Sequence, residues 1–128
     1  MVSLPCFSQT SGKRVLTDHD DSLKLTPAQV KENEIKALDG SPEAANKLAN
    51  YYQGVKLDVP QAMQWYQVAA ENGSAEAMWN YYIVSTAVTD PEWVRRGQFW
   101  LKRSAAMGYQ SAVERLKQNG SSDSKVQK

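Results

Sequence analysis

Residue types that build catalytic and metal sites are scarce in this chain of 128 residues, which has one cysteine and one histidine. Cys6 alone cannot form an internal disulfide framework or a cysteine-rich zinc site. No serine or cysteine has a suitable base in register, and no glycine-rich phosphate loop follows a strand pattern. We therefore expect a protein that is not an enzyme and that has no cofactor.

Long apolar runs are missing as well. No run reaches the roughly 18 residues that span a bilayer, and the N-terminus lacks the apolar core of a secretory signal. We expect a cytoplasmic protein, or a periplasmic one if a signal peptide has been removed. With 15 basic and 14 acidic residues the formal net charge is +1, so no strong field steers the chain to nucleic acid or to an anionic membrane.

Both ends of the chain are polar and lack periodicity, which predicts a flexible arm at 1–24 and a disordered tail at 119–128. The acidic cluster at 18–21, which includes the histidine, carries metal-binding groups, but nothing nearby would order it around one ion, so we expect no metal site. Pro5 stands where lipoprotein processing needs a small residue, so a free thiol at Cys6 is favoured over lipidation.

Residues 25–118 show a dense helical pattern and form the one expected domain, with six predicted helices. A capping residue, often followed by proline, opens five of these helices, and glycine commonly closes them. The predicted caps are Thr26, Ser41, Asp58, Ser74 and Asp90. No segment alternates apolar and polar residues as a strand does, so the fold class is all-α.

Two stretches of this region carry the same pattern 35 residues apart, as Trp65 and Trp100 show. Each tryptophan belongs to an aromatic or apolar pair, is followed after four residues by two small residues, and precedes a glycine by eight residues, at Gly73 and Gly108. A period in the mid-thirties is typical of stacked helical hairpins, in which each repeat buries its apolar face against its neighbours.

The register extends to a third glycine, Gly40. Alanine stands four residues after each of the three glycines, and leucine or tyrosine stands eight residues after each. The small residue lets two helices approach closely, and the large residue fills the space beyond it.

These residues resemble the Sel-one-like repeat, a relative of the tetratricopeptide repeat in which each unit is an antiparallel helix pair. Its pattern is matched in the first unit by Gly40, Ala44, Leu48, Tyr52, Asp58, Ala62, Trp65, Ala69, Ala70 and Gly73. The second unit departs from the pattern at Tyr81, Ser85 and Gly97, and Tyr82 stands where the family has glycine, which leaves the helix spacing of that unit open. The resemblance implies a short right-handed α-solenoid of about 2.5 repeats.

Similarity to this family implies a protein that acts by gripping another protein. Several bacterial members are immunity proteins that neutralise secreted toxins, and others scaffold signalling or envelope complexes. We therefore expect a protein–protein interaction module, monomeric when alone, that binds and neutralises a cognate bacterial toxin or effector. The alternative is a scaffold or adaptor in a bacterial signalling or cell-envelope complex.

In this architecture the first helix of each pair lines the concave surface, so the positions six, seven and ten after each glycine should face a binding groove. In the first two units these are Asn46, Lys47, Asn50, Trp79, Asn80 and Ile83, and in the third they are Glu114, Arg115 and Gln118. An exposed tryptophan and isoleucine beside amides resemble the core of an interface. The alternative for Trp79 is packing against a neighbouring repeat or under the N-terminal arm.

Two further groups have a structural and a functional interpretation. The helical spacing favours core packing over ligand stacking for the aromatic residues Tyr52, Trp65, Tyr66 and Trp100. A solvated helix face, with contact to an acidic partner as the alternative, is expected for the basic residues Arg95, Arg96, Lys102 and Arg103.

Overall fold

The computed structural model describes the backbone of residues 22–127 and the side chains of residues 22–121. Most of the predicted arm, including Cys6 and the cluster at 18–21, lies outside the described residues. The helices are α2 (Pro27–Leu38), α3 (Pro42–Gly54), α4 (Val59–Glu71), α5 (Ala75–Ser85), α6 (Pro91–Ala106) and α7 (Gln110–Gln127). No strand occurs between residues 22 and 127, so the all-α prediction is confirmed.

The predicted caps account for the helix boundaries. The hydroxyl of Ser41 accepts a hydrogen bond from the Ala44 amide at 3.1 Å, which satisfies a donor that the first turn leaves free. Thr26 forms a reciprocal capping box with Gln29, whose side chain accepts from the Thr26 amide at 2.9 Å. The sequence interpretation identified the threonine but not its partner glutamine.

Glycine is required where α2, α4 and α6 end. Gly40, Gly73 and Gly108 have φ values of 105°, 102° and 89°, in the left-handed region that other residues rarely adopt. The three glycines that share the sequence register therefore mark the turns that follow α2, α4 and α6.

The last helix is longer than the sequence pattern indicates. The apolar spacing ends near Lys117 and predicts a disordered tail from residue 119, whereas α7 continues to Gln127. Gly120 lies within this extension, and a glycine costs a helix only about 1 kcal/mol relative to alanine. Apolar spacing reports burial, so it does not register a helix end that has no neighbour to pack against.

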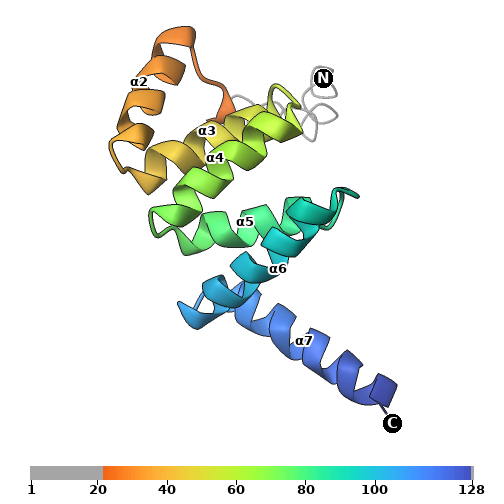
Figure 1. The fold of residues 1–128 in the computed structure, drawn as a ribbon. Helices are drawn as coiled ribbons and strands as arrows, with labels where there is room; N and C mark the ends of the chain where they lie inside the picture. The colour runs from red at the N-terminus through yellow and green to blue at the C-terminus, as the bar shows by residue number, and fades with distance from the viewer. Residues whose placement is uncertain (1–21, 128) are drawn as a thin grey trace, which may run out of the picture.

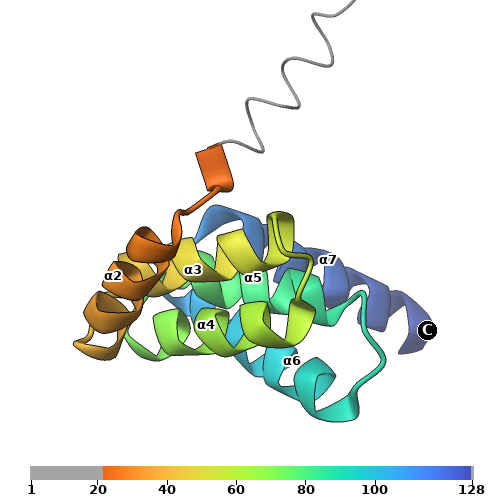
Figure 2. The same ribbon diagram turned by 90° about the horizontal axis from the view of Figure 1, so that it is seen from above.

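Each helix packs against the next one in the chain, and the most extensive contacts join α3 to α4 and α5 to α6. Figure 1 shows the helices following one another from α2 at one end to α7 at the other, with the C-terminal half of α7 extending beyond the rest. In the second view α3, α5 and α7 lie along one side, and α4 and α6 lie along the other (Figure 2).

The main core fills the space between α2 and α6. Leu48, Met63 and Tyr66 are its largest fully buried members, and alanines from α3, α4 and α5 pack between them. A smaller cluster of Tyr82, Leu101 and their neighbours joins α7 to the rest of the protein. This second cluster is the only one of the two that includes α7 residues, so α7 depends on a few side chains.

The aromatic residues singled out in the sequence pack into or against this core. Tyr66 and Trp100 are buried, whereas Tyr52 and Trp65 are half-buried at its edge. Core packing is therefore confirmed for this group, but the two tryptophans at equivalent positions are not equally buried.

The crossing of α5 and α6 explains how the second unit accommodates its bulky tyrosine. A Cβ added at Gly97 would collide with the Ser85 side chain, coming within 2.8 Å of its Cβ, and would lie 3.5 Å from the Tyr82 Cα. Small residues therefore meet where these helices cross, and the two backbones approach closely enough for Tyr82 to pack on Leu101 beyond the crossing.

Candidate functional site

Three of the residues predicted for the binding groove surround one hollow on α3. Asn46, Lys47 and Asn50 fall on one face because residues three and four apart are neighbours on a helix. They line a hollow of about 290 Å³ whose other walls are Ser22, Leu23 and Glu43. None of the residues that line it comes from α5, so the structure does not bring the α3 and α5 predictions together in this hollow.

Asn46 carries an unpaired polar atom at this hollow. Its side-chain oxygen is shielded from solvent and has no hydrogen-bond partner among the described residues. A buried acceptor without a donor costs about 1–3 kcal/mol. Because this oxygen is shielded from a docked partner as it is from water, Asn46 contributes a polar wall to the hollow and not an accessible acceptor.

Lys47 is exposed and lies between two hollows. The second, of about 170 Å³, is lined by residues that include Asn33, Lys36 and Ser41. Glu43 borders both hollows, but Lys47 forms no ion pair with any described residue. The ammonium group therefore remains available to an acidic group of a partner.

Asn50 already has a role inside the protein. The Tyr66 hydroxyl lies 2.8 Å from the side-chain oxygen of Asn50 and 2.7 Å from that of Gln53. The hydroxyl has one proton to donate, so one of the two amides must turn its NH₂ group towards the tyrosine. Burial raises the pKa of Tyr66, with a smaller contribution from the carboxylate of Glu76, and keeps the phenol neutral.

Trp79, the predicted anchor on α5, packs against α7. Its ring lies 5.6 Å from the ring of Tyr82 and 6.3 Å from that of Tyr109, and the guanidinium of Arg115 lies 5.7 Å from its centroid. Arg115 also donates a hydrogen bond to the Tyr82 hydroxyl at 2.9 Å. Packing against a neighbouring helix, the alternative given for Trp79, is what the structure shows.

The two other predicted residues of α5 differ in exposure. Asn80 is half-buried, whereas Ile83 is 37% exposed and is the exposed large apolar side chain of this helix. Of the six predicted contact residues, Lys47 and Ile83 are therefore the ones that are exposed and have no internal bond that a substitution would disturb.

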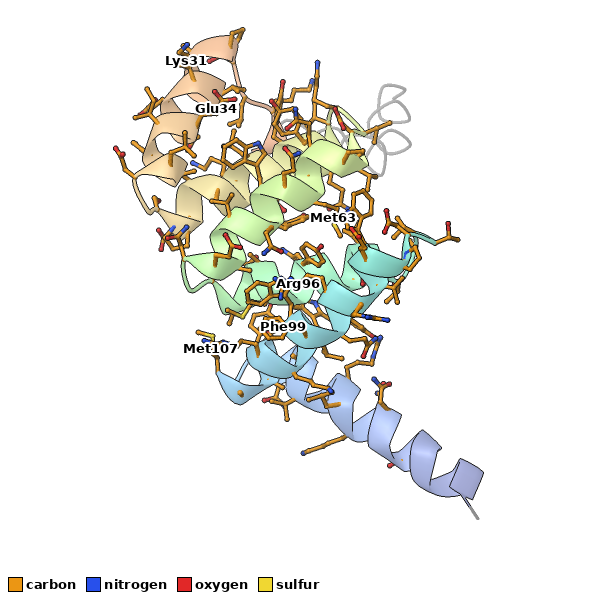
Figure 3. All side chains as sticks on the ribbon, in the orientation of Figure 1. Lys31, Glu34, Met63, Arg96, Phe99 and Met107 are labelled. Atoms are coloured by element: carbon orange, nitrogen blue, oxygen red, sulfur yellow. The ribbon has the colours of Figure 1, made fainter. Side chains whose placement is uncertain are left out.

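The structure reveals a second surface that the sequence interpretation did not assemble, which we call the α4–α6 face. Its main hollow, of about 550 Å³, is lined by residues of α4, α5 and α6, namely Ala70, Glu71, Gly73, Met78, Arg96, Phe99, Trp100, Arg103 and Met107. Figure 3 shows Arg96, Phe99 and Met107 succeeding one another along this side of the protein.

A second hollow adjoins the first on the same face and shares Arg96 with it. It measures about 400 Å³ and also contacts Met63, Tyr81 and Trp93. In the sequence this surface was visible only as four basic residues on one helix. The exposed Phe99 and Met107 lie outside the repeat pattern, and that departure is the signal that would have located the surface.

Between residues 22 and 127, no group of three or more histidine, cysteine, aspartate or glutamate side chains is arranged to hold a metal ion. None of the helices in this part of the chain combines the length and apolar character needed to cross a membrane.

No protein-family model matches the chain, and neither a curated protein nor a solved structure is significantly similar to it. Its function is therefore argued from the surfaces described above.

Proposed function

We propose that this chain is a short α-solenoid of Sel-one-like helix pairs that binds a cognate protein and inhibits it, as an immunity protein does. The binding surface lies on the side of α3 and α5, with Lys47 as the central contact and Ile83 as an apolar contact. The protein acts as a binding partner and not as an enzyme.

The observation that carries this proposal is the hollow on α3. It combines an exposed cation on Lys47, which has no ion pair with a described residue, with the polar residues Ser22, Glu43, Asn46 and Asn50 beside the apolar Leu23. A polar surface of this kind suits a partner that offers a hydrogen-bond donor and a carboxylate. An interface of about 800 Å² on each side is sufficient for a stable complex.

A specific observation also favours the second candidate, an adaptor. The α4–α6 face is a separate exposed surface, formed by helices that lie on the other side of the protein from α3 and α5 (Figure 2). A protein with two binding faces can bridge two partners, whereas an inhibitor needs one.

Photo-cross-linking tests the proposal in the full-length chain, expressed in its source organism. A photoreactive residue replaces Lys47 in one variant and, as a matched control, Lys31, an exposed lysine of α2 (Figure 3). We expect one protein to be cross-linked from position 47 and not from position 31. Cross-linking of that protein with equal yield from both positions would contradict the assignment of the surface.

The purified partner then distinguishes the two candidates. An inhibitor abolishes the partner's activity at one-to-one stoichiometry, and Lys47→Glu weakens that inhibition without changing the thermal midpoint of the chain. An adaptor leaves the activity intact and binds a second protein at the same time. If Lys47→Glu inhibits as well as the wild type, the α3 surface is not the binding site.

A further inference from the structure

We propose that the α4–α6 face binds an acidic segment of a partner protein, which inserts an apolar side chain between Phe99 and Met107 and places a carboxylate on Arg96. This inference uses different residues from the α3 surface and does not depend on the function proposed above.

Two large apolar side chains are exposed beside the main hollow of this face. Phe99 is 43% and Met107 is 52% exposed, and both border the hollow of about 550 Å³. Single exposed apolar residues are common on protein surfaces, but two that flank one hollow with a buried tryptophan in its wall form a patch. Such a patch accommodates one apolar side chain of a partner.

The wall of the hollow is fixed in place. The Trp100 indole N–H donates a hydrogen bond to the side-chain oxygen of Gln67 at 3.0 Å, which ties α6 to α4. Trp100 is only 5% exposed, and its ring meets Phe99 edge-on at a centroid distance of 4.8 Å. A preorganised surface loses little conformational entropy when it binds a partner.

The position of the Arg96 guanidinium favours an acidic group of a partner. The Arg96 guanidinium lies 4.9 Å from the Phe99 ring centroid and 5.6 Å from that of Trp100, which holds it over the aromatic rings. Neither Arg96 nor Arg103 forms an ion pair or a hydrogen bond with any described residue. The planar guanidinium of Arg96 therefore keeps its donors free for the two oxygens of a carboxylate.

Two acidic residues, Glu71 and Glu92, also line the hollows and equal Arg96 and Arg103 in number, so the site for a carboxylate is local to the Arg96 guanidinium. Glu71 accepts a hydrogen bond from Gln67 at 2.6 Å, and Glu92 lies in the adjoining hollow near the start of α6. Four basic side chains project from the exposed positions of α6, namely Arg95, Arg96, Lys102 and Arg103. The helix is therefore basic overall along its exposed length.

The same features disfavour other occupants. A second copy of the chain would bring one set of arginines against another, which is repulsive at close range. Binding of single-stranded nucleic acid requires aromatic rings open to stack successive bases. Here Phe99 is the one ring exposed in the main hollow, because Trp100 is buried.

Selection from a library of random twelve-residue peptides, displayed against the full-length chain, tests the proposal without knowledge of the natural partner. We expect the selected peptides to be enriched in aspartate or glutamate beside a leucine, phenylalanine or other large apolar residue. Their affinity, measured by fluorescence anisotropy, should fall as salt rises because the contact is partly ionic.

Matched variants locate the site. Arg96→Ala should weaken binding of a selected peptide about tenfold or more, because hydrogen bonds to charged groups are among the strongest, and Phe99→Ala should weaken it about fivefold or more. Arg96→Lys keeps the charge but removes the planar fork, so it should not restore full affinity. Lys102→Ala changes an exposed residue of α6 outside the hollow, so it is the matched control and should leave affinity unchanged.

Four outcomes would overturn the proposal. The first is a peptide set without acidic enrichment, and the second is binding that survives both Arg96→Ala and Phe99→Ala in folded protein. The third is a chain that dimerises through this face, detected by light scattering as a doubled mass that Phe99→Ala halves. A single-stranded oligonucleotide that binds more tightly than the acidic peptides would also contradict it.

Discussion

The pair α3–α4 and the pair α5–α6 carry different residues at positions that the glycine register of the sequence aligns. Ala49 and Ala62 occupy the positions in the first pair that Tyr82 and Gly97 occupy in the second. The first pair therefore has two small side chains where the second has one large side chain and none. One tyrosine is larger than two alanines, and the second pair accommodates it with a close crossing at Gly97 and Ser85.

The outer sides of the two pairs differ more than their crossings. Tyr66 in the first pair bonds to the amides of α3, whereas Leu101, its counterpart, is buried without a polar group. Asn46 leaves an acceptor unpaired, while its counterpart Trp79 supports α7. The two positions therefore differ in role, since Trp79 packs against α7 and Asn46 borders a hollow, although α2 also packs on α3.

The largest effect should separate the two tryptophans. Trp100→Ala removes a buried ring and its bond to Gln67, and should lower the free energy of unfolding by about 3–5 kcal/mol. Trp65→Ala removes a half-buried ring and should cost about half as much or less. Urea denaturation followed by far-ultraviolet circular dichroism measures both. Equal losses would show that the two pairs bury their tryptophans alike.

A smaller effect should distinguish Trp79 from Asn46. Trp79→Ala should cost about 2 kcal/mol, because it removes a ring that joins α5 to α7. Asn46→Ala should not lower stability and should raise it by up to about 1–3 kcal/mol, because it removes a buried acceptor that has no donor. Hydrogen exchange of the first turns of α7 should quicken in the former variant and not in the latter. The distinction is wrong if both variants lose the same free energy of unfolding and the amides of α7 exchange equally fast in both.

Tyr66→Phe should cost about 1 kcal/mol at neutral pH by removing the bond to the amides of α3. Burial raises the pKa of Tyr66 above its ordinary value of 10.0, so above pH 10 the unfolded chain binds fewer protons than the folded one. Stability is therefore full below pH 10 and falls as pH rises further.

The alkaline decline should be shallower in Tyr66→Phe than in the wild type, although Tyr81, whose pKa burial also raises, still contributes to it. Unfolding curves at several pH values between neutrality and pH 11 measure the slope. An identical slope in both proteins would show that a group other than Tyr66 causes the loss of stability at alkaline pH.

The smallest effect concerns Ser104, whose counterpart in the first pair is Ala69. Its hydroxyl donates to the carbonyl of Ala75 at 2.8 Å, in a buried position. Ser104→Ala should cost about 0.5 kcal/mol, because the carbonyl still accepts the bond of its own helix. The same denaturation assay measures this difference, and a loss as large as that of Trp79→Ala would contradict the account.

The helices were predictable because their signals are local. Caps such as Thr26 and Ser41, and left-handed glycines such as Gly40, act on the first or last turn and need no distant partner. The end of α7 was not predictable, because the apolar spacing that reports burial disappears where nothing packs. In the sequence Gly97 is only a departure from the repeat pattern. The structure explains it, because a side chain at this position would collide with Ser85 where α6 crosses α5.

The candidate surfaces were predictable in part. The register placed Asn46, Lys47 and Asn50 together, as the structure shows, since they share one helix. It could not reveal that Trp79 packs on α7 or that Phe99 and Met107 flank a hollow, because both depend on contacts between helices.

The close crossing of α5 and α6 is tested most directly by the sign of one stability change. By helix propensity alone, Gly97→Ala should stabilise α6 by about 1 kcal/mol. The close crossing predicts the opposite, a loss of about 1–3 kcal/mol from overpacking, which Ser85→Gly in the same protein should reduce. If Gly97→Ala leaves the free energy of unfolding unchanged or raises it, α5 and α6 do not cross as closely as the structure indicates.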